Sequence, residues 1–555
     1  MQNIADFGVL YGQKTTEDAL LIYSSYEDSK VSPRTGDFIV LTPSDESGPK
    51  FLARVEAEIY DEDPIFRSQD KTLVAVHYAR IAERELSDRD KQKIFSYTYK
   101  IKILGMFIIS GSSIKFTTAV RKLPTVSYHA RHLNQLEINE ILNKDNKSGV
   151  KIGNLCIGDE IYKDKGNILF DINKLRNKRT MVFAQSGFGK TNLVKVLLNY
   201  MIGDTSYGKL IFDLNGEYFI KSNNTSGPLG LGDINNLNIK NNLVVYSDKT
   251  IPADYNNSFI YKGKVLIDST RNLSVGDILS FGTGFSDVMK SFLLYLDEEG
   301  VGDFIKNIDS YVGDPSKLHI DFPDFFGAES KTQKDTVSAR KTIMAIRKRI
   351  RHLIDEGKGV HSSNSTIIED VFEYLRQGKT LIIDLSLKDS FDASIISTVI
   401  VRNLFELNKQ NYTSQEHENL INHDRNIINT VIFIEEAQNV LSEEFVKSNA
   451  NPFVRIAKEG RKFGIGLVAI TQRPSAISEE IRTQAENFMV FHMGNSDDIK
   501  ALIKSNINYE GVIAKFIQTE TIPGNLYMVS SDQSFVLPIR VEEFDKLVKN
   551  NSNNI

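Results

Sequence analysis

The segment AQSGFGKTN (residues 184–192) has the residue types and spacing of a phosphate-binding loop. It follows the apolar run TMVF and precedes a segment with the spacing of an amphipathic helix, which is the context that the G-x-x-x-x-G-K-[ST] pattern requires. Its later glycines let backbone amides close around phosphate oxygens, and the helix directs its positive end at the same phosphates. A glycine-rich turn before a helix is the alternative interpretation. We expect Lys190 to contact the β- and γ-phosphates of ATP and Thr191 to ligate Mg²⁺. The predicted nucleotide-binding residues are Ser186, Gly187, Phe188, Gly189, Lys190, Thr191 and Asn192.

Two adjacent carboxylates are the second candidate for chemistry. The segment TVIFIEEAQN (residues 430–439) is an apolar strand that ends in Glu435 and Glu436. A Mg²⁺-dependent NTPase needs such acids beside its phosphate loop, so we expect Glu435 to hold Mg²⁺ through water and Glu436 to polarise the attacking water. Taken alone, the pair also fits two solvated acids at a strand end. Its combination with the loop favours the NTPase interpretation.

A third segment, VRIAKEGRKFGIGLVAITQRPS (residues 454–475), combines a helix end with a buried strand. Gln472 follows that strand and could sense the γ-phosphate. Arg461, at the helix end, could reach the nucleotide of a neighbouring subunit as an arginine finger. Lys462 and Arg473 are rival candidates for that role. The alternative is that these cations form surface ion pairs, which contribute little.

Two kinds of apolar patterning indicate the elements that must position these residues. Up to about residue 166, apolar and polar residues alternate, as in FLARVEAEI (residues 51–59), which predicts an antiparallel sheet or small barrel. From about residue 179, short apolar runs are separated by helical segments, which predicts a mainly parallel α/β sheet buried on both faces. The other predicted strands of the first region are 20–23, 37–41, 72–79, 95–103 and 114–120.

These patterns predict an α/β P-loop ATPase domain preceded by an antiparallel β-domain. Between about residues 281 and 378 the pattern is helical, and VSARKTIMAIRKRIRHLIDEG (residues 337–357) has apolar residues at three-to-four spacing. We therefore expect a helical insertion in the ATPase domain. The predicted boundaries are 1–166 for the antiparallel sheet or small barrel, 167–545 for the ATPase domain with its insertion at about 281–378, and 546–555 for a flexible tail.

Composition narrows the class of protein. The chain has 555 residues and a net charge of −5, so any contact with nucleic acid must use a local surface and not a general basic field. The single cysteine, Cys156, rules out an intrachain disulfide and fits a reducing compartment. No run of 18 apolar residues and no signal-like N-terminus is present, so we expect a cytoplasmic protein without a membrane segment. The scattered histidines give no zinc pattern.

Four motifs, in this order, resemble those of the HerA family of the HerA–FtsK superfamily: FAQSGFGKTN, IFDLNGEY, IFIEEAQN and IAKEGRKFGIGLVAITQRPS. Members are hexameric RecA-like DNA translocases with an N-terminal β-barrel called the HAS-barrel. The resemblance in motifs covers roughly residues 180–540, LPIRVEEF included, and the alternating strands of 1–166 fit the barrel. It implies a RecA-like P-loop ATPase domain with a helical insertion, preceded by a HAS-barrel-like domain.

The resemblance also implies roles for individual residues. Two departures from the family pattern stand out: Ala184 replaces the first glycine of the loop, and Gln438 stands where members often carry histidine. The implied roles are phosphate and Mg²⁺ binding for Lys190 and Thr191, the metal shell for Glu435, the hydrolytic water for Glu436, a sensor for Gln472 and a trans finger for Arg461.

The implied function is an ATP-hydrolysing homo-hexamer that moves duplex DNA. Such rings work beside a nuclease such as NurA or, in antiviral systems, beside Sir2-type or other effectors, and we expect a NurA-like or Sir2-like partner to dock on the N-terminal barrel. The alternative is a regulatory ring that assembles and gates an effector without processive translocation, and a third option is an NTPase with no polymer substrate. DNA-stimulated hydrolysis discriminates among them. Candidate DNA contacts are the loops after Gly216 or Pro474 and the cluster Arg347, Lys348, Arg349 and Arg351, which also fits the solvated face of an amphipathic helix.

Overall fold

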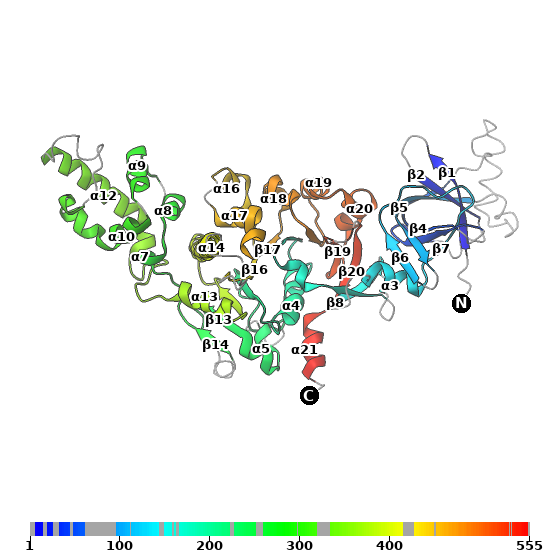
Figure 1. Cartoon of the computed structure of the whole chain (residues 1–555), viewed down its shortest axis with the longest axis horizontal. Coiled ribbons are helices and arrows are strands. Elements are labelled where there is room, and N and C mark those ends of the chain that lie inside the picture. Colours follow the sequence, from blue (N-terminus) through cyan, green and yellow to red (C-terminus); the bar gives the residue numbers. More distant parts are fainter. Residues whose placement is uncertain are drawn as a thin grey trace, which may run out of the picture. The chain divides into compact units, whose positions relative to one another are not determined.

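The computed structural model of the chain separates into two compact units (Figure 1). Unit 1 comprises residues 1–171 and 488–542, and unit 2 comprises residues 172–487 and 543–555. The residues described are 6–14, 19–25, 33–44, 48–60, 96–110, 113–143, 149–157, 160–161, 166–221, 227–250, 259–282, 284–296, 298–318, 333–414, 427–448, 451–531, 533 and 535–552.

The N-terminal part of unit 1 is a closed antiparallel barrel, as the alternating pattern predicts. Six strands form the ring in the order β2-β1-β7-β3-β4-β5, and pairing of β2 with β5 closes it. In β4, Phe51, Ala53 and Val55 point into the buried core, so the inward face is the apolar one. The predicted strand at 72–79 lies outside the described residues. The strands are β1 (Asp6–Lys14), β2 (Ala19–Ser25), β3 (Phe38–Thr42), β4 (Lys50–Tyr60), β5 (Ser96–Ser110), β7 (His129–His132) and β6 (Ser113–Thr117), which extends the sheet by pairing with β5.

The rest of unit 1 comprises helix α3 (Gln135–Asn143), a second set of strands, and two short helices from the C-terminal part of the chain. The strands run in the order β10-β8-β20-β19-β18, and the pairings within this set are antiparallel. These elements are β8 (Val150–Ile157), β10 (Asn167–Phe170), β18 (Asn487–Val490), α19 (Ser496–Ser505), α20 (Val512–Thr519), β19 (Asn525–Val529) and β20 (Leu537–Val541).

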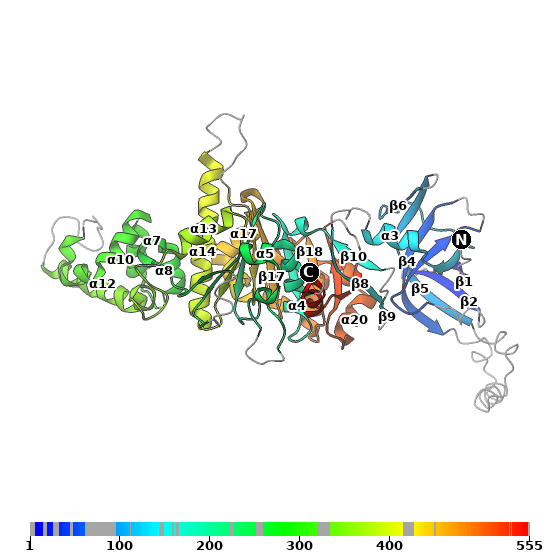
Figure 2. The same cartoon turned by 90° about the horizontal axis from the view of Figure 1, so that it is seen from below.

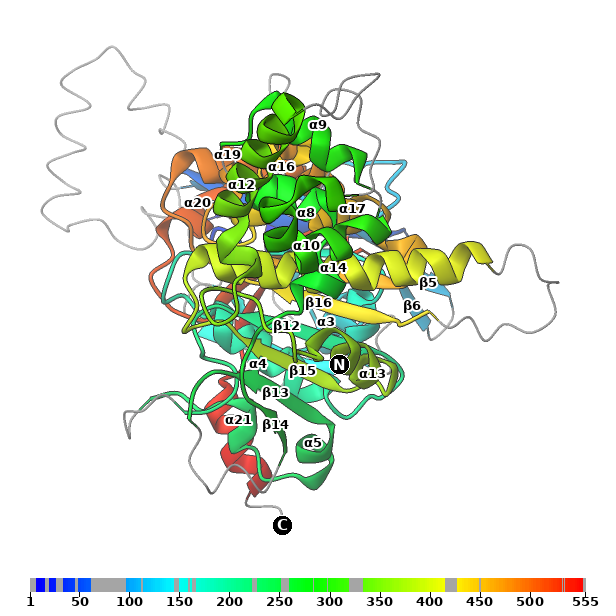
Figure 3. The same ribbon diagram turned by 90° about the vertical axis from the view of Figure 1, so that its left-hand side faces the viewer.

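Unit 2 is built on a parallel sheet with the order β11-β17-β16-β12-β15-β13-β14. Most of these strands are buried along their whole length, which explains their uninterrupted apolar runs. Figure 3 shows β16, β12, β15, β13 and β14 side by side, with α13 (Ile367–Arg376) packed on β12 and β15. The strands are β11 (Arg179–Phe183), β12 (Gly208–Asp213), β13 (Leu243–Ser247), β14 (Ile260–Lys262), β15 (Thr380–Asp384), β16 (Thr430–Ile434) and β17 (Ile465–Thr471).

A group of helices is inserted between β14 and β15 (Figure 2). The longest, α12 (Gln333–Ile354), buries Ile343, Ile346, Ile350 and Leu353, which is the stripe that the sequence predicts. It packs against α7 (Ser269–Asn272), α9 (Asp287–Tyr295) and α10 (Glu298–Gly313). No helix in the described ranges of the chain is long and apolar enough to pass through a lipid bilayer.

Candidate active site

The phosphate loop connects β11 to α4 (Lys190–Met201), the strand–loop–helix context that the motif requires. Gly187 and Gly189 adopt φ angles of 85° and 106°, which a side chain would strain. Ala184 is fully buried at the strand end, and its backbone N–H donates to the carbonyl of Thr471 at 3.2 Å. Its methyl group therefore belongs to the core and not to the loop. The first amides of α4 have no acceptor within the helix and remain available to an anion.

Parallel pairing brings the other predicted residues to the same edge of the sheet. β17 lies between β11 and β16, with Phe183 beside Thr471 and Ile434 beside Ala469. The segments that follow these three strands therefore leave one carboxyl edge together. They carry Lys190 and Thr191 after β11, Glu435 and Glu436 after β16, and Gln472 after β17.

Glu436 is held by two glutamine side chains. Gln472 donates from Nε2 to Glu436 Oε1 at 2.8 Å, and Gln438 donates from Nε2 to Glu436 Oε2 at 2.7 Å. The hydroxyl of Thr471 donates to Gln438 Oε1 at 2.6 Å, which orients that amide. Glu436 also has a φ angle of 45°, an uncommon conformation for a non-glycine residue and one that often marks functional positions. Sequence reasoning missed the contact between Gln438 and Glu436.

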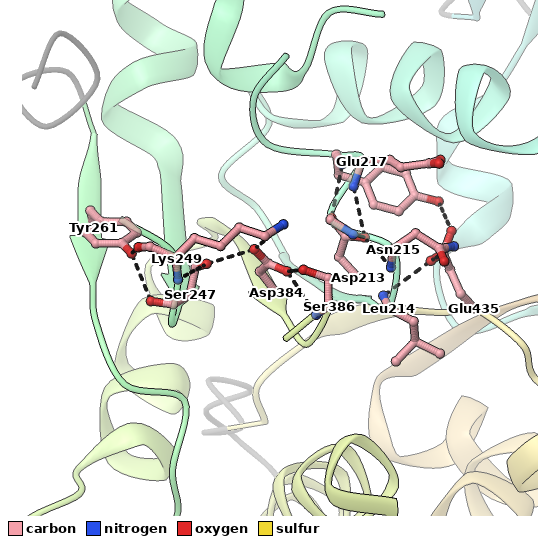
Figure 4. Close-up of polar contacts among 12 residues, drawn as sticks. Asp213, Leu214, Asn215, Glu217, Ser247, Lys249, Tyr261, Asp384, Ser386 and Glu435 are labelled. Atoms are coloured by element: carbon pink, nitrogen blue, oxygen red, sulfur yellow. Dashed lines mark hydrogen bonds and ion pairs between the residues drawn. The ribbon is translucent and has the colours of Figure 1, made fainter. Parts of the chain in front are cut away.

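Glu435 is buried and tied to the loop after β12. Its carboxylate accepts from the Tyr218 hydroxyl at 2.9 Å, from Asn215 Nδ2 at 3.1 Å and from the backbone N–H of Leu214 at 3.3 Å (Figure 4). Burial raises the pKa of Glu435 to about 8, and the neighbouring Asp213 adds to this effect. The motif IFDLNGEY therefore supplies hydrogen-bond donors to the Glu435 carboxylate. This role of the motif was not evident from its sequence.

A row of polar side chains continues along this edge of the sheet (Figure 4). Asp213 and Asp384 are paired in register, so two like charges lie side by side. Asp213 accepts from four backbone N–H groups of residues 215–218, while burial raises its pKa to about 6. Asp384 accepts from the hydroxyls of Ser247 and Ser386 and lies 3.2 Å from Lys249 Nζ. Backbone N–H groups therefore offset the negative charge of Asp213, and two hydroxyls and Lys249 offset that of Asp384.

Lys190 and Thr191 lie close to carboxylates. Burial lowers the pKa of Lys190, and three nearby acids offset part of that effect. The hydroxyl of Thr191 donates to Glu217 Oε2 at 2.8 Å. The three acids near Lys190 are Glu436, Glu435 and Glu217.

These residues fit a magnesium–nucleotide complex. A threonine hydroxyl and carboxylate oxygens are the hard ligands that Mg²⁺ prefers. In the described part of the chain, no three or more His, Cys, Asp or Glu residues gather into a metal-binding group. Mg²⁺ bound with a nucleotide usually takes most of its ligands from phosphates and water.

A cavity of about 500 Å³ adjoins the phosphate loop within unit 2. It is lined by Thr191, Asn192 and Glu217 together with Phe544 from the C-terminal helix α21 (Phe544–Ser552). Asn192 Oδ1 accepts from the backbone N–H of Phe544 at 2.9 Å, so the start of α21 is fixed to the first turn of α4. Sequence reasoning assigned Asn192 to nucleotide binding alone and missed this contact.

The predicted arginine finger lies away from these groups. Arg461 belongs to the 3₁₀-helix η5 (Gly460–Phe463), which precedes β17, whereas Gln472 follows it. The seven residues of β17 separate the two edges by roughly 20 Å. Arg461 is exposed, and none of the described residues pairs with its guanidinium. Arg473 lies at the carboxyl edge beside Gln472. Lys462 Nζ lies 4.8 Å from the centroid of the Tyr412 ring.

The predicted basic cluster on α12 is partly neutralised. Arg347 Nε lies 2.9 Å from Asp309 Oδ1, and Arg347 Nη2 lies 2.7 Å from Asp355 Oδ1. Arg349 donates to the carbonyl of Gly284 at 2.8 Å. These contacts favour the solvated face of a packed helix over a free row of cations.

Comparisons with known families agree with the motifs. A family model described as "Helicase HerA, central domain" matches residues 150–404, and one described as "Zonular occludens toxin (Zot)" matches residues 338–499. A "Probable helicase" of Methanocaldococcus jannaschii is 22% identical over 524 residues, covering 93% of this chain and 88% of the relative. The "DNA double-strand break repair helicase HerA" of Sulfurisphaera tokodaii is 25% identical over 403 residues, covering 71% of this chain and 70% of the relative.

Solved structures to which the chain is similar include VirB4 of Thermoanaerobacter pseudethanolicus, with a TM-score of 0.41 and 14% identity, covering 72% of this chain and 97% of that one. The bacterial conjugative coupling protein TrwB also has a TM-score of 0.41, with 13% identity, covering 72% of this chain and 92% of that one.

Proposed function

This chain belongs to the HerA family of P-loop ATPases, and from that premise we propose that it is a hexameric DNA translocase. It would hydrolyse ATP with Mg²⁺ and act on duplex DNA together with a nuclease or antiviral effector protein. In this proposal residues 1–166 dock the partner and residues 167–545 form the motor. Helix α21 (Phe544–Ser552) continues the motor beyond residue 545, so the predicted tail does not begin at residue 546. The name of the S. tokodaii relative, a DNA double-strand break repair helicase, supports DNA as the substrate.

One observation carries the hydrolytic part of the proposal: Glu436 lies beside the phosphate loop with both carboxylate oxygens engaged by glutamine amides. Two amide donors fix the direction of the carboxylate, which a base must have to accept a proton from water. Lys190 would bind the β- and γ-phosphates, and Thr191 and Glu435 would hold the metal. Bound Mg²⁺ would neutralise charge on the phosphates. Gln472, directly after the strand between β11 and β16, would report the state of the γ-phosphate to Glu436.

The position of Arg461 supports a ring. It is exposed at the amino edge of β17, roughly 20 Å from the carboxyl edge, so it cannot serve the nucleotide of its own subunit. A second subunit would have to receive it, and an arginine finger in trans makes hydrolysis depend on assembly. Arg473, at the carboxyl edge, is the rival for a role in the same subunit.

The first test measures ATP turnover and native mass with and without duplex DNA. We expect a hexamer whose turnover rises with DNA and falls at least about 100-fold in Lys190→Ala and Glu436→Gln. If ATP turnover is unchanged by DNA and rises only when a partner protein is added, the regulatory-ring alternative is favoured over the translocase. Absence of turnover under all these conditions would contradict the proposal as a whole.

A second test separates the two arginines. Subunits carrying Lys190→Ala and subunits carrying Arg461→Ala are each expected to be inactive alone. Mixed rings regain turnover if Arg461 acts in trans, because some interfaces pair an intact loop with an intact arginine. The matched control mixes Lys190→Ala subunits with Arg473→Ala subunits. This mixture should regain no turnover if Arg473 acts in its own subunit. Failure of the Arg461 mixture, with mass showing mixed rings, would exclude the trans assignment.

A further inference from the structure

Two cations lie opposite each other on the outside of the barrel in unit 1. Arg54 of β4 and Lys102 of β5 are partners in the antiparallel register, so their side chains leave the same face. Ala53 and Val55, on either side of Arg54, belong to the barrel core, which places Arg54 on the outer face. Like charges in this arrangement repel each other. A position where residue types conflict with the local structure in this way is often functional.

Arg54 is buried although it faces outward. Its side chain is 2% exposed, and its Nε and Nη2 atoms donate to Glu56 Oε1 at 2.9 and 2.8 Å. Glu56 Oε2 accepts in turn from the backbone N–H of Val512 at 3.3 Å, at the start of α20. Within the described residues, the third nitrogen, Nη1, has no hydrogen-bond partner. A buried guanidinium nitrogen without an acceptor is unfavourable unless something supplies one.

A cavity of about 230 Å³ lies against these two cations. Its polar lining consists of Arg54, Lys102, Thr118 and Asn508, and the rest of its described lining is apolar. None of the described residues that line it is acidic. Glu56 offsets one positive charge from behind, so the pocket keeps an excess of positive charge.

A second cavity, of about 680 Å³, shares Lys102 with the first and adds Lys100 and Lys515 to the lining. Lys100 lies two residues from Lys102 on β5, so both side chains leave the same face of the strand. Glu56 and Glu510 also line this cavity, so it is less strongly positive than the small pocket.

We propose that the small pocket binds a phosphate group, with Arg54 and Lys102 as its cationic donors. A guanidinium and an ammonium, with a hydroxyl and a carboxamide beside them, offer donors on several sides, which suits a tetrahedral oxyanion better than a planar carboxylate. The phosphate belongs either to a free phosphate compound or to the backbone of a nucleic acid strand that continues past Lys100 and Lys515. Only the second source rests on the proposed DNA translocase.

The test for free phosphate uses the full chain with Lys190→Ala, because the phosphate loop also binds phosphate. Millimolar inorganic phosphate should raise the melting temperature relative to chloride at equal ionic strength. Adding Lys102→Gln should abolish the shift, whereas Lys102→Arg and Lys115→Gln should retain it. Lys115 is an exposed lysine on β6 that does not line either cavity, which makes it the matched control. An equal shift with acetate would overturn the phosphate assignment.

The test for nucleic acid measures duplex binding by fluorescence anisotropy over a range of salt concentrations. If the phosphate is part of a strand, Lys102→Gln should weaken binding for all sequences and reduce the slope of log K against log salt by about 1. Lys115→Gln should leave the slope unchanged. A slope change identifies a strand as the source, and a phosphate-dependent melting shift without it identifies a free compound. If Lys102→Gln changes neither, the proposal is wrong, whether or not DNA stimulates ATP turnover.

Discussion

Replacing Tyr218 with phenylalanine tests whether the loop after β12 supports the proposed Mg²⁺ site at Glu435. The Tyr218 hydroxyl and the Glu435 carboxylate are both buried and lie 2.9 Å apart, so no water can take the place of the lost donor without rearrangement. A hydrogen bond to a charged group contributes about 1.5–3 kcal/mol, which corresponds to about 10- to 150-fold in an equilibrium constant. Loss of the bond also raises the pKa of Glu435 further above its usual range, which favours the neutral acid over the metal-binding carboxylate.

The direct measurement is the affinity for ADP with and without Mg²⁺. We expect Tyr218→Phe to bind ADP alone as the wild type does, because the hydrogen bond that it loses goes to Glu435 and not to a residue of the phosphate loop. The gain in affinity that Mg²⁺ provides should fall by about 10- to 100-fold, the usual effect of removing a group that supports a metal ligand. A fluorescent ADP analogue gives both constants on the same sample.

Tyr509→Phe is the matched control. Its hydroxyl is also fully buried, and it donates to the backbone carbonyl of Tyr527 at 3.0 Å in unit 1. Both variants should melt a few degrees lower than the wild type, but only Tyr218→Phe should lose the gain from Mg²⁺. An undiminished gain in Tyr218→Phe would refute the role of this bond in holding a metal ligand.

Three further predictions follow from the same region and from the sheet behind it. Ala184→Gly should change nucleotide affinity less than about threefold, since the methyl group lies in the core; a tenfold tightening in ADP titrations would show that it obstructs the loop. Gln438→Leu should lower kcat about tenfold with unchanged ADP affinity, because Glu436 loses one of two orienting donors worth about 1.5 kcal/mol or more; unchanged kcat in steady-state assays would contradict this. Burial lowers the pKa of Lys209 to about 8, so the unfolded chain binds more protons between about pH 8 and pH 10, and stability should rise with pH there by up to about 2 kcal/mol. In Lys209→Met that rise should be missing, which melting curves at the two pH values would reveal; parallel curves would contradict it.

The sequence predicted the parts of the fold that depend on local pattern. The alternation in FLARVEAEI fixes which face of β4 is apolar, and the core residues Phe51, Ala53 and Val55 confirm it. The apolar stripe of α12 was also predicted from the sequence, and its residues are buried. The order of the parallel strands was not, because it depends on which apolar run pairs with which, and runs buried on both faces are nearly interchangeable in composition.

In the candidate site, too, local pattern identified some residues and only the three-dimensional pairing identified the others. Lys190, Glu436 and Gln472 could be chosen from the sequence because each is a polar residue at the end of an apolar run, and parallel strands bring such ends together. Their partners could not be chosen. Tyr218 is a tyrosine in a turn, and Gln438 is an amide near many others, so only the three-dimensional pairing identifies them.

The partners also separate structural acids from chemical ones along the carboxyl edge. Asp213 is satisfied by the backbone of its own loop and Asp384 by neighbouring hydroxyls and Lys249, so removing either would disturb a turn. Glu435 takes its donors from the loop after β12, which makes it a link between two strands. Glu436 alone among these four combines a positive φ with side-chain amides as its donors, and amides can rotate away when a better acceptor arrives. A γ-phosphate oxygen is such an acceptor for Gln472, so nucleotide binding would free one oxygen of Glu436 while Gln438 retains the other.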